Sequence, residues 1–155
     1  MHCNPNVMRY VGGVLTAKQN AEDLSKILAH YGSDDTSFLV WAIERATDKA
    51  FVGTCALIIN DKEEHEIGYR LSEAFWGHGY GLEVTEALID HAFHTLRLQD
   101  LVAYVDKANE PSVHILNKSS FNFDSEYYNE ELKCTDRRYT LSRREWQALK
   151  DNAVS

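Results

Sequence analysis

The sequence has few of the residues that mark several classes of protein. Its 155 residues include three cysteines, Cys3, Cys55 and Cys134, which lie far apart and form no C-x-x-C pair. This argues against a disulfide framework or a zinc ribbon and favours reduced thiols. No apolar run approaches the roughly 18 residues that a membrane-spanning helix needs, and the N-terminus lacks a signal-peptide pattern. We therefore expect a cytoplasmic protein without a membrane partner.

Basic residues are also scarce. Sixteen lysines and arginines stand against 24 acidic residues, which gives a net charge of −8 and an isoelectric point near 5.3. Nucleic acids and anionic membranes are therefore poor partners, whereas a cationic partner such as an amine is compatible. His91 and His94 share a helix face, but no further ligands are marked, so we expect no metal.

The length fits one domain, residues 1–155, because the chain has no repeat and neither Pro5 nor Pro111 lies in a linker. Thr16 and Gln19 have the spacing of a capping box at the start of a helix. Three strand patterns with short turns predict an antiparallel meander. The order of the later elements predicts a mixed α+β sheet with helices on its faces. The strands are expected at 38–44, 51–59, 65–71, 101–105, 121–128 and 133–141, with helices at 82–97 and after Asn109.

A glycine-dense loop separates the third strand pattern from the next helix. Gly77, Gly79 and Gly81 alternate with larger residues immediately before the helix. A helix start presents unpaired N–H groups and a positive dipole end, and glycines let the backbone approach a ligand closely. We expect a phosphate cradle formed by the amides of residues 78–82. The alternative is a tight turn that binds nothing. Neither a G-K-[ST] motif nor full G-x-G-x-x-G spacing is present.

Two blocks identify a family. The segment EIGYRLSEAFWGHGYGLEVTEAL resembles the acyl-CoA-binding signature of the GNAT superfamily of N-acetyltransferases, and most resembles the RimJ and RimL branch. The second block, NEPSVHILNKSSF, resembles the family's asparagine block, with Ser120 in place of the usual glycine. The matching residues are Trp76, Gly77, Gly79, Tyr80, Gly81 and Glu86 in the first block and Asn109, Ser112, Lys118 and Phe121 in the second.

The resemblance extends upstream to NPNVMRYVGG. Family members usually carry another strand and a helical start before this segment, whereas Met1 here lies almost directly before it. The resemblance therefore implies the GNAT fold, a central and mostly antiparallel mixed sheet with helices on both faces, and we expect the usual first strand to be absent. The structure of one sheet edge and of part of the acceptor site is therefore not determined by the resemblance.

The resemblance implies acetyl transfer from acetyl-CoA to an amine, either a protein N-terminal amine or a small amine, by direct attack. The loop amides would hold the pyrophosphate, and the pantetheine arm would pair with the edge of strand 65–71. The residues implied in cofactor binding are Arg70, Leu71, Trp76, His78, Gly79, Tyr80, Gly81, Leu82, Asn109 and Ser112.

Candidate catalytic residues also follow from the resemblance. Glu66, just before the IGY segment, is the first candidate for the general base, and Glu131 is the second. Many family members use a tyrosine to protonate the leaving thiolate, and Leu116 occupies the position of that tyrosine here. The resemblance offers Ser112 as the branch's alternative polar group near the sulfur. Glu66 could instead be a solvent-facing strand residue, and Ser112 a first-turn residue that bonds to the backbone. We propose no cysteine nucleophile.

Two other functions stay open from the sequence. One is a catalytically silent acyl-CoA-binding module with the same fold, which the leucine at position 116 allows. The other is a structural partner protein without a ligand. The identity of the amine is not determined, and the protein is expected to be a monomer or a homodimer.

Overall fold

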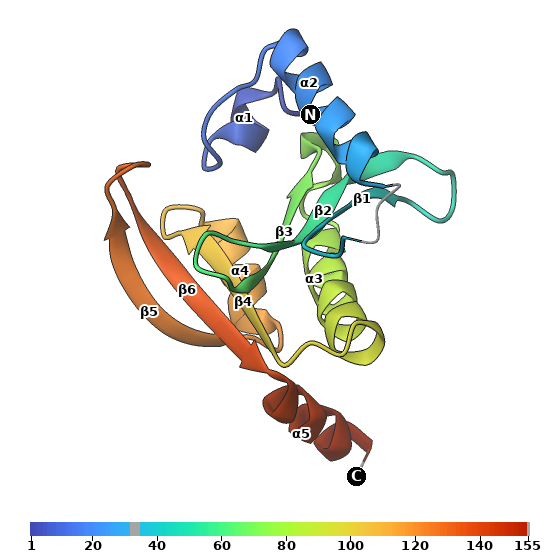
Figure 1. Ribbon diagram of the computed structural model, residues 1–155, viewed down its shortest axis with the longest axis vertical. Coiled ribbons are helices and arrows are strands. Elements are labelled where there is room, and N and C mark those ends of the chain that lie inside the picture. The colour runs from blue at the N-terminus through green and yellow to red at the C-terminus, as the bar shows by residue number, and fades with distance from the viewer. Residues whose placement is uncertain (32–34, 155) are drawn as a thin grey trace.

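The computed structural model describes residues 1–31 and 35–154, and six strands form one sheet across it (Figure 1). Their spatial order is β1-β2-β3-β4-β6-β5. The strands are β1 (Phe38–Glu44), β2 (Phe51–Ile59), β3 (His65–Leu71), β4 (Asp100–Asp106), β5 (Asn122–Asn129) and β6 (Cys134–Ser142). The expected mixed, mostly antiparallel sheet is confirmed.

The sheet is made of two antiparallel halves that meet at a parallel seam. Strands β1, β2 and β3 form the predicted meander, and β4, β6 and β5 form the second half. β3 and β4 run parallel and are in register only at Glu66 and Val102. Beyond this point the two strands separate toward their C-terminal ends. The parallel seam therefore opens a gap in the middle of the sheet.

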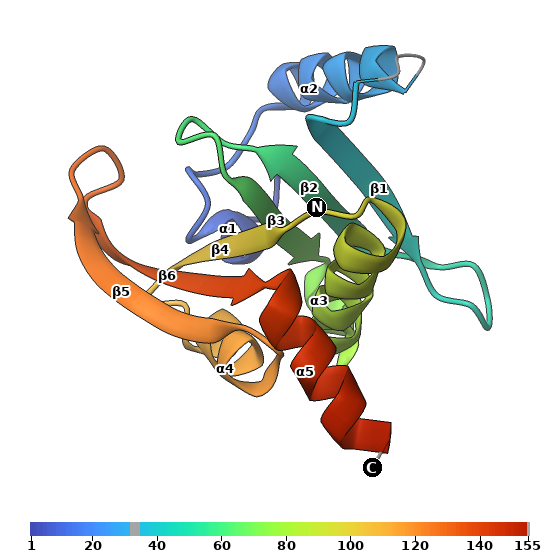
Figure 2. The same ribbon diagram turned by 60° about the horizontal axis from the view of Figure 1, so that its bottom comes forward.

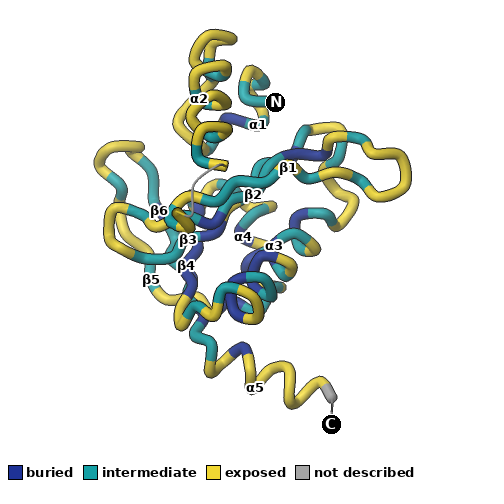
Figure 3. The backbone as a smooth tube through the Cα atoms, turned by 45° about the vertical axis from the view of Figure 1, so that its right-hand side comes forward, coloured by how far each residue is buried: buried dark blue, intermediate teal, exposed yellow. Residues whose placement is uncertain are grey.

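Helices cover both faces of the sheet, as expected (Figure 2). One face carries α3 (Tyr80–Asp90), α4 (Glu110–Lys118) and α5 (Arg143–Val154), and the short α1 (Pro5–Met8) and α2 (Ala17–His30) lie on the other side. The main core lies under α3 and α4 and includes Ile89, Phe93, Leu101 and Leu141. In Figure 3 the buried backbone is concentrated in the central strands and α3, whereas α2 and α5 are largely exposed.

Local signals account for the helix starts. The Thr16 capping box forms completely, because the Gln19 N–H donates to Thr16 Oγ1 (3.2 Å) and the Thr16 N–H donates to Gln19 Oε1 (2.9 Å). Asn109 caps α4 by accepting a hydrogen bond from the Ser112 N–H at 3.4 Å. α1 is the first element in the described part of the chain, and β1 stands at one edge of the sheet.

Two features differ from the sequence prediction. The helix expected at 82–97 begins earlier, at Tyr80, and its last turn, His91–Thr95, is a π-helix. The final helix, α5, was not predicted. Its signal is present in the sequence, because Ser142 and Glu145 form a reciprocal cap at 2.8 and 3.3 Å. Among the described residues, no helix is long and apolar enough to cross a membrane.

Candidate active site

A cavity of about 800 Å³ lies where the C-terminal end of β3, the glycine loop, the start of α4 and the segment around α1 meet. It contacts Tyr69 and Arg70, which point to opposite faces of β3, so it extends through the gap between β3 and β4. The structure brings most of the expected cofactor residues to this cavity: Arg70, Leu71, Trp76, Gly79, Tyr80, Gly81, Leu82, Asn109 and Ser112. His78 stands apart, because its ring stacks beside Tyr80 and its Nδ1 donates to the Trp76 carbonyl oxygen at 2.8 Å.

The glycine loop presents free backbone donors at this cavity. Gly77 and Gly79 have φ angles of +75° and +84°, and Gly79 is the N-cap of α3. The Glu83 N–H donates to the Gly79 carbonyl oxygen at 3.2 Å. The N–H groups of the three residues before Glu83 therefore have no partner within the helix. Together with the positive end of the helix dipole, they form a suitable site for a phosphate group.

Gly81 is required for space rather than for its backbone angles. A Cβ atom at this position would stand 2.6 Å from Ile115 Cδ1 and 3.2 Å from Tyr69 Oη. The absence of a side chain thus lets the first turn of α3 approach both α4 and β3. Thr85 Oγ1 donates to the Gly81 carbonyl oxygen at 2.8 Å and fixes this turn from inside.

Two sets of contacts hold the cavity walls. Trp76 Nε1 donates to the Leu71 carbonyl oxygen at 3.0 Å and ties the loop to the end of β3. Glu73, on the short helix Glu73–Phe75, accepts hydrogen bonds from Asn4 Nδ2 (2.9 Å) and Asn6 Nδ2 (2.8 Å). These bonds hold α1 beside the loop. This segment was not expected in the site, although its family-like NPNVMRYVGG sequence was a signal. The cavity is lined by Asn6 and Val7 of α1 and by the following Arg9, Tyr10 and Val11.

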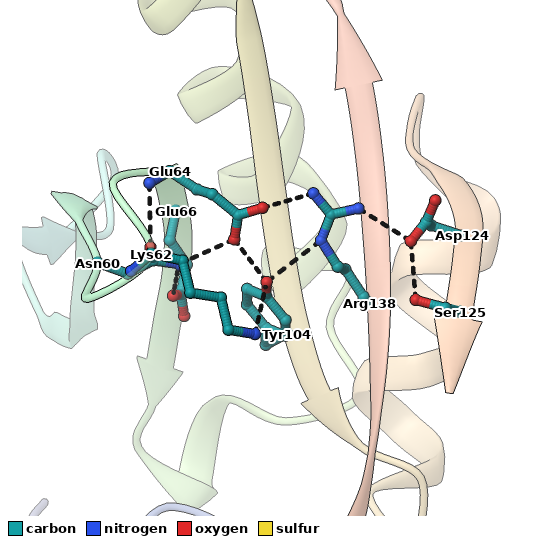
Figure 4. Close-up of polar contacts among 8 residues, drawn as sticks. All are labelled: Asn60, Lys62, Glu64, Glu66, Tyr104, Asp124, Ser125 and Arg138. Atoms are coloured by element: carbon teal, nitrogen blue, oxygen red, sulfur yellow. Dashed lines mark hydrogen bonds and ion pairs between the residues drawn. The ribbon is translucent and has the colours of Figure 1, made fainter. Parts of the chain in front are cut away.

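Glu66 lies at the vertex where β3 and β4 separate (Figure 4). It does not line the cavity. Its carboxylate accepts a hydrogen bond from Asn60 Nδ2 at 3.0 Å. Burial raises the pKa of Glu66. The Asn60 hydrogen bond and the charge of Lys62 oppose this shift, whereas the charges of Glu64 and Asp136 add to it. The half-buried position excludes the fully solvent-facing alternative for this side chain.

A polar network surrounds Glu66 on the same face of the sheet (Figure 4). Glu64 accepts hydrogen bonds from Tyr104 Oη and Arg138 Nη2, both at 2.5 Å, and Arg138 Nη1 donates to Asp124 Oδ2 at 2.9 Å. Burial opposes ionisation of Glu64, but the bonds from Tyr104 and Arg138 lower its pKa. Glu64 is therefore an ionised group paired with Arg138, whereas Glu66 has no ion-pair partner in the described part of the chain.

The other catalytic candidates are placed differently. Glu131 is exposed in the turn between β5 and β6, does not line the cavity, and donates its N–H to Asn129 Oδ1 at 3.1 Å. Ser112 lines the cavity from the first turn of α4. Leu116 is buried in the core, so no polar group enters the cavity from that position. The structure thus brings Ser112 to the cavity, places Glu66 at the vertex of the gap between β3 and β4, and leaves Glu131 outside the cavity.

Tyr69 was not assigned to the site from the sequence. It lines the cavity, and its hydroxyl oxygen is buried without a hydrogen-bond partner among the described residues. The only signal was its place in the EIGY segment. Burial raises the pKa of the Cys55 thiol to about 11, so this thiol is protonated at neutral pH. The described residues contain no group of three histidines, cysteines or acidic residues that could hold a metal ion.

The comparison with known families decides the chemistry. Residues 1–122 match the family model of the acetyltransferase (GNAT) domain. The chain belongs to the GNAT acetyltransferase family. The expectation from the two sequence blocks is confirmed at this level, and the protein is an acetyl-CoA-dependent N-acetyltransferase.

The acetyltransferase also resembles individual proteins. It is 31% identical over 121 residues to the uncharacterized N-acetyltransferase p20 of Bacillus licheniformis. The alignment covers 76% of this chain and 67% of that relative. A GNAT-family acetyltransferase structure from Bacillus anthracis superimposes with a TM-score of 0.78 at 17% identity, over 92% of this chain and 85% of that one. The structure of spermidine N-acetyltransferase from Vibrio cholerae, in complex with CoA and spermine, superimposes with a TM-score of 0.77 at 19% identity. The match covers 94% of this chain and 88% of that one.

The cavity fits the co-substrate of this acetyltransferase. Acetyl-CoA carries a pyrophosphate, which suits the free amides at the start of α3, and a long peptide-like arm, which suits the gap between two strands. The unpaired hydroxyl of Tyr69 is consistent with a bound ligand at this place.

Proposed function

We propose that the single domain of residues 1–155 transfers an acetyl group from acetyl-CoA to a small cationic amine, with Glu66 as the general base. The position of Glu66 carries this proposal. Its half-buried carboxylate lies at the vertex of the gap, on the face of the sheet opposite α3 and α4. The gap itself opens onto the cofactor cavity, so an amine on the Glu66 face would meet the acetyl group through the gap.

The charge of this face favours a cationic acceptor. Asp136 is buried, and it lies near enough to Glu66 to raise the pKa of that residue. Neither carboxylate forms an ion pair with another residue in the described part of the chain. An ammonium group would compensate both charges. Spermidine N-acetyltransferase, which has a similar fold, binds spermine in its crystal structure, and this supports the choice of a small amine.

Each residue has a defined part in the proposed reaction. The amides of Tyr80, Gly81 and Leu82 bind the pyrophosphate, and a backbone N–H on β3 polarises the thioester carbonyl. Glu66, directly or through one water, takes a proton from the ammonium, and the amine nitrogen then attacks the carbonyl carbon. The carbon–sulfur bond breaks with its electron pair on sulfur, and Ser112 stabilises the resulting thiolate. The second proton leaves the former amine nitrogen and protonates this thiolate, which gives the amide and CoA.

The branch within the family belongs to the same proposal. The Trp-Gly-x-Gly-Tyr loop and the serine at 112 favour a RimJ- or RimL-like member. RimJ and RimL acetylate protein N-terminal amines, so a peptide N-terminus is the second acceptor. The two unpaired carboxylates beside the gap favour the small amine over the peptide.

The test is an acetylation assay with acetyl-CoA and a panel of spermidine, a simple alkylamine and a short peptide with a free N-terminus. We expect turnover of a small amine and a loss of about 10²-fold in kcat for Glu66→Gln. The affinity for CoA, measured by calorimetry, should not change in this variant. Glu130→Gln, in the exposed turn before β6, is the matched control and should keep full activity.

Three results would contradict the proposal. Loss of turnover in Glu131→Gln, with Glu66→Gln unaffected, would move the general base to the second candidate. Binding of CoA without turnover of any amine would establish the silent binding module. Absence of CoA binding would support the third alternative, a structural partner protein without a ligand. In that case CoA would not raise the melting temperature, whereas a bound ligand at a hundredfold excess over its Kd stabilises a protein by about 2.7 kcal/mol.

A further inference from the structure

The hydroxyl of Tyr69 is the only buried side-chain nitrogen or oxygen in the described residues that has no hydrogen-bond partner. A buried hydroxyl without a partner is destabilising, so buried polar groups are nearly always paired. Phenylalanine would pack the same ring without this cost. An unpaired phenol at this position therefore calls for a partner that the chain itself does not supply.

The surroundings of Tyr69 indicate where this partner lies. Tyr69 lines the cofactor cavity, and a Cβ atom on Gly81 would stand 3.2 Å from its hydroxyl oxygen. The hydroxyl thus lies beneath the first turn of α3, whose amides form the phosphate site. On the other side is α4. Burial raises the pKa of Tyr69, and a side-chain interaction with Ser112 on α4 lowers it. Ser112 nevertheless does not reach the Tyr69 hydroxyl with the geometry of a full hydrogen bond, so the hydroxyl remains unsatisfied.

The position of Tyr69 along β3 indicates which part of the ligand passes it. A strand rises about 3.3 Å per residue, so Tyr69 lies about 7 Å from Leu71 at the loop and about 10 Å from Glu66 at the vertex. A ligand that spans from the phosphate site to the vertex must place its arm beside Tyr69. The polar groups of the pantetheine arm are two amides and one hydroxyl, and each of these bonds readily to a phenol.

We propose that Tyr69 is a cofactor-positioning residue whose hydroxyl forms a hydrogen bond with the pantetheine arm of acetyl-CoA. The contact would hold the arm in the gap between β3 and β4, with the thioester at the vertex. This proposal rests on the use of acetyl-CoA by the family and does not depend on which amine is acetylated. Its test therefore uses CoA binding without an acceptor, and it can fail or succeed independently of the proposed acceptor and general base.

The experiment compares Tyr69→Phe with wild type by calorimetric titration of two ligands, CoA and adenosine 3′,5′-bisphosphate, which lacks the arm. We expect the Kd for CoA to rise about tenfold and the Kd for the bisphosphate to stay the same. The unliganded variant should melt at the same temperature as wild type or higher, because it loses an unpaired hydroxyl.

Tyr139→Phe is the matched control. The Tyr139 hydroxyl is in the core and donates to Asn117 Oδ1 at 2.9 Å. This variant should melt at a lower temperature and keep the wild-type affinity for CoA, which is the opposite pattern to Tyr69→Phe.

Three results would overturn the assignment. An unchanged Kd for CoA would exclude the contact. A lower melting temperature of unliganded Tyr69→Phe would show that the hydroxyl is structural. An equal loss of affinity for both ligands would place the effect at the phosphate end.

Discussion

At the residue scale, the three glycines of the loop serve two different purposes. Gly77 and Gly79 adopt positive φ angles that other residues rarely adopt, and a Cβ atom on either would meet no other atom within 4 Å. Gly81 has no such angle but leaves no room for a Cβ atom. The sequence pattern showed only the density of glycine. The backbone angles and the neighbouring helix distinguish the two roles.

Gly79→Ala tests the backbone role. The left-handed conformation costs a residue with a Cβ atom about 1–2 kcal/mol, so the free energy of unfolding should fall by about this amount. The affinity for CoA should also fall, because relief of the strain turns the first amides of α3 away from the phosphate. Urea unfolding and calorimetric titration measure the two effects.

Gly12→Ala provides the control for this prediction. Gly12 has a φ of +86° and equally open surroundings, but it does not line the cavity. The Gly12→Ala variant should lose a similar amount of unfolding free energy and keep the wild-type affinity for CoA. Equal effects of the two variants on binding would contradict the loop assignment.

Glu66 predicts a particular dependence of stability on pH. Burial raises its pKa in the folded protein above the ordinary 4.5. The folded state therefore binds this proton more tightly, and the resulting stabilisation is present below the unfolded pKa and is lost as the pH rises through the folded pKa. Glu66→Gln removes this dependence. The variant should gain stability relative to wild type as the pH rises above the ordinary pKa of 4.5, as measured by urea unfolding. A relative loss of stability as the pH rises above 4.5 would show that the folded pKa is lowered.

At the element scale, α3 presents its first backbone amides at the cavity, and α4 with its N-cap Asn109 brings Ser112 there, so the cavity depends on how these two helices are joined. Glu86 on α3 joins them. Its carboxylate accepts hydrogen bonds from the Ser120 N–H (2.8 Å) and from the Ser120 hydroxyl (3.0 and 3.3 Å). The serine that replaces the family's usual glycine thus adds a bond of its own.

Glu86→Ala should lower the free energy of unfolding by about 1–3 kcal/mol, because it leaves a partly buried N–H unpaired. Denaturant unfolding checks this. Glu22→Ala, on exposed α2 with only a 3.9 Å ion pair to Lys18, should change stability by less than about 0.5 kcal/mol. A similar change in both variants would show that the Glu86 bonds contribute little.

The observed elements also show which local sequence signals were sufficient to predict secondary structure. The first three strands were predicted at their observed bounds, because short turns and β-forming residues separate them clearly. The π-helical turn at His91–Thr95 was missed, since its hydrophobic spacing still resembles an ordinary helix. The final helix, α5, was missed although Ser142 and Glu145 carried its cap.

At the scale of the whole molecule, the cavity joins segments that lie far apart in the chain. Residues of α1, the end of β3, the glycine loop and α4 meet around it. The parallel seam between the two antiparallel halves creates the gap that the cavity enters. Both halves could be predicted as antiparallel pairs, but the separation of β3 from β4 depends on how the halves pack.

The amino-acid sequence by itself determined the order of the six strands, the glycine loop before α3 and the family, because these depend on local spacing and on residues that are adjacent in the chain. Only the tertiary structure decided which candidate side chains share the site. The sequence places Glu66 within a predicted strand and Glu131 between two predicted strands. Only the structure shows that Glu66 lies at the vertex of the gap and that Glu131 is exposed outside the cavity. Likewise, the missing partner of Tyr69 became visible only when its neighbours were in place. Burial and hydrogen bonding are properties of residues that folding brings together from distant parts of the chain.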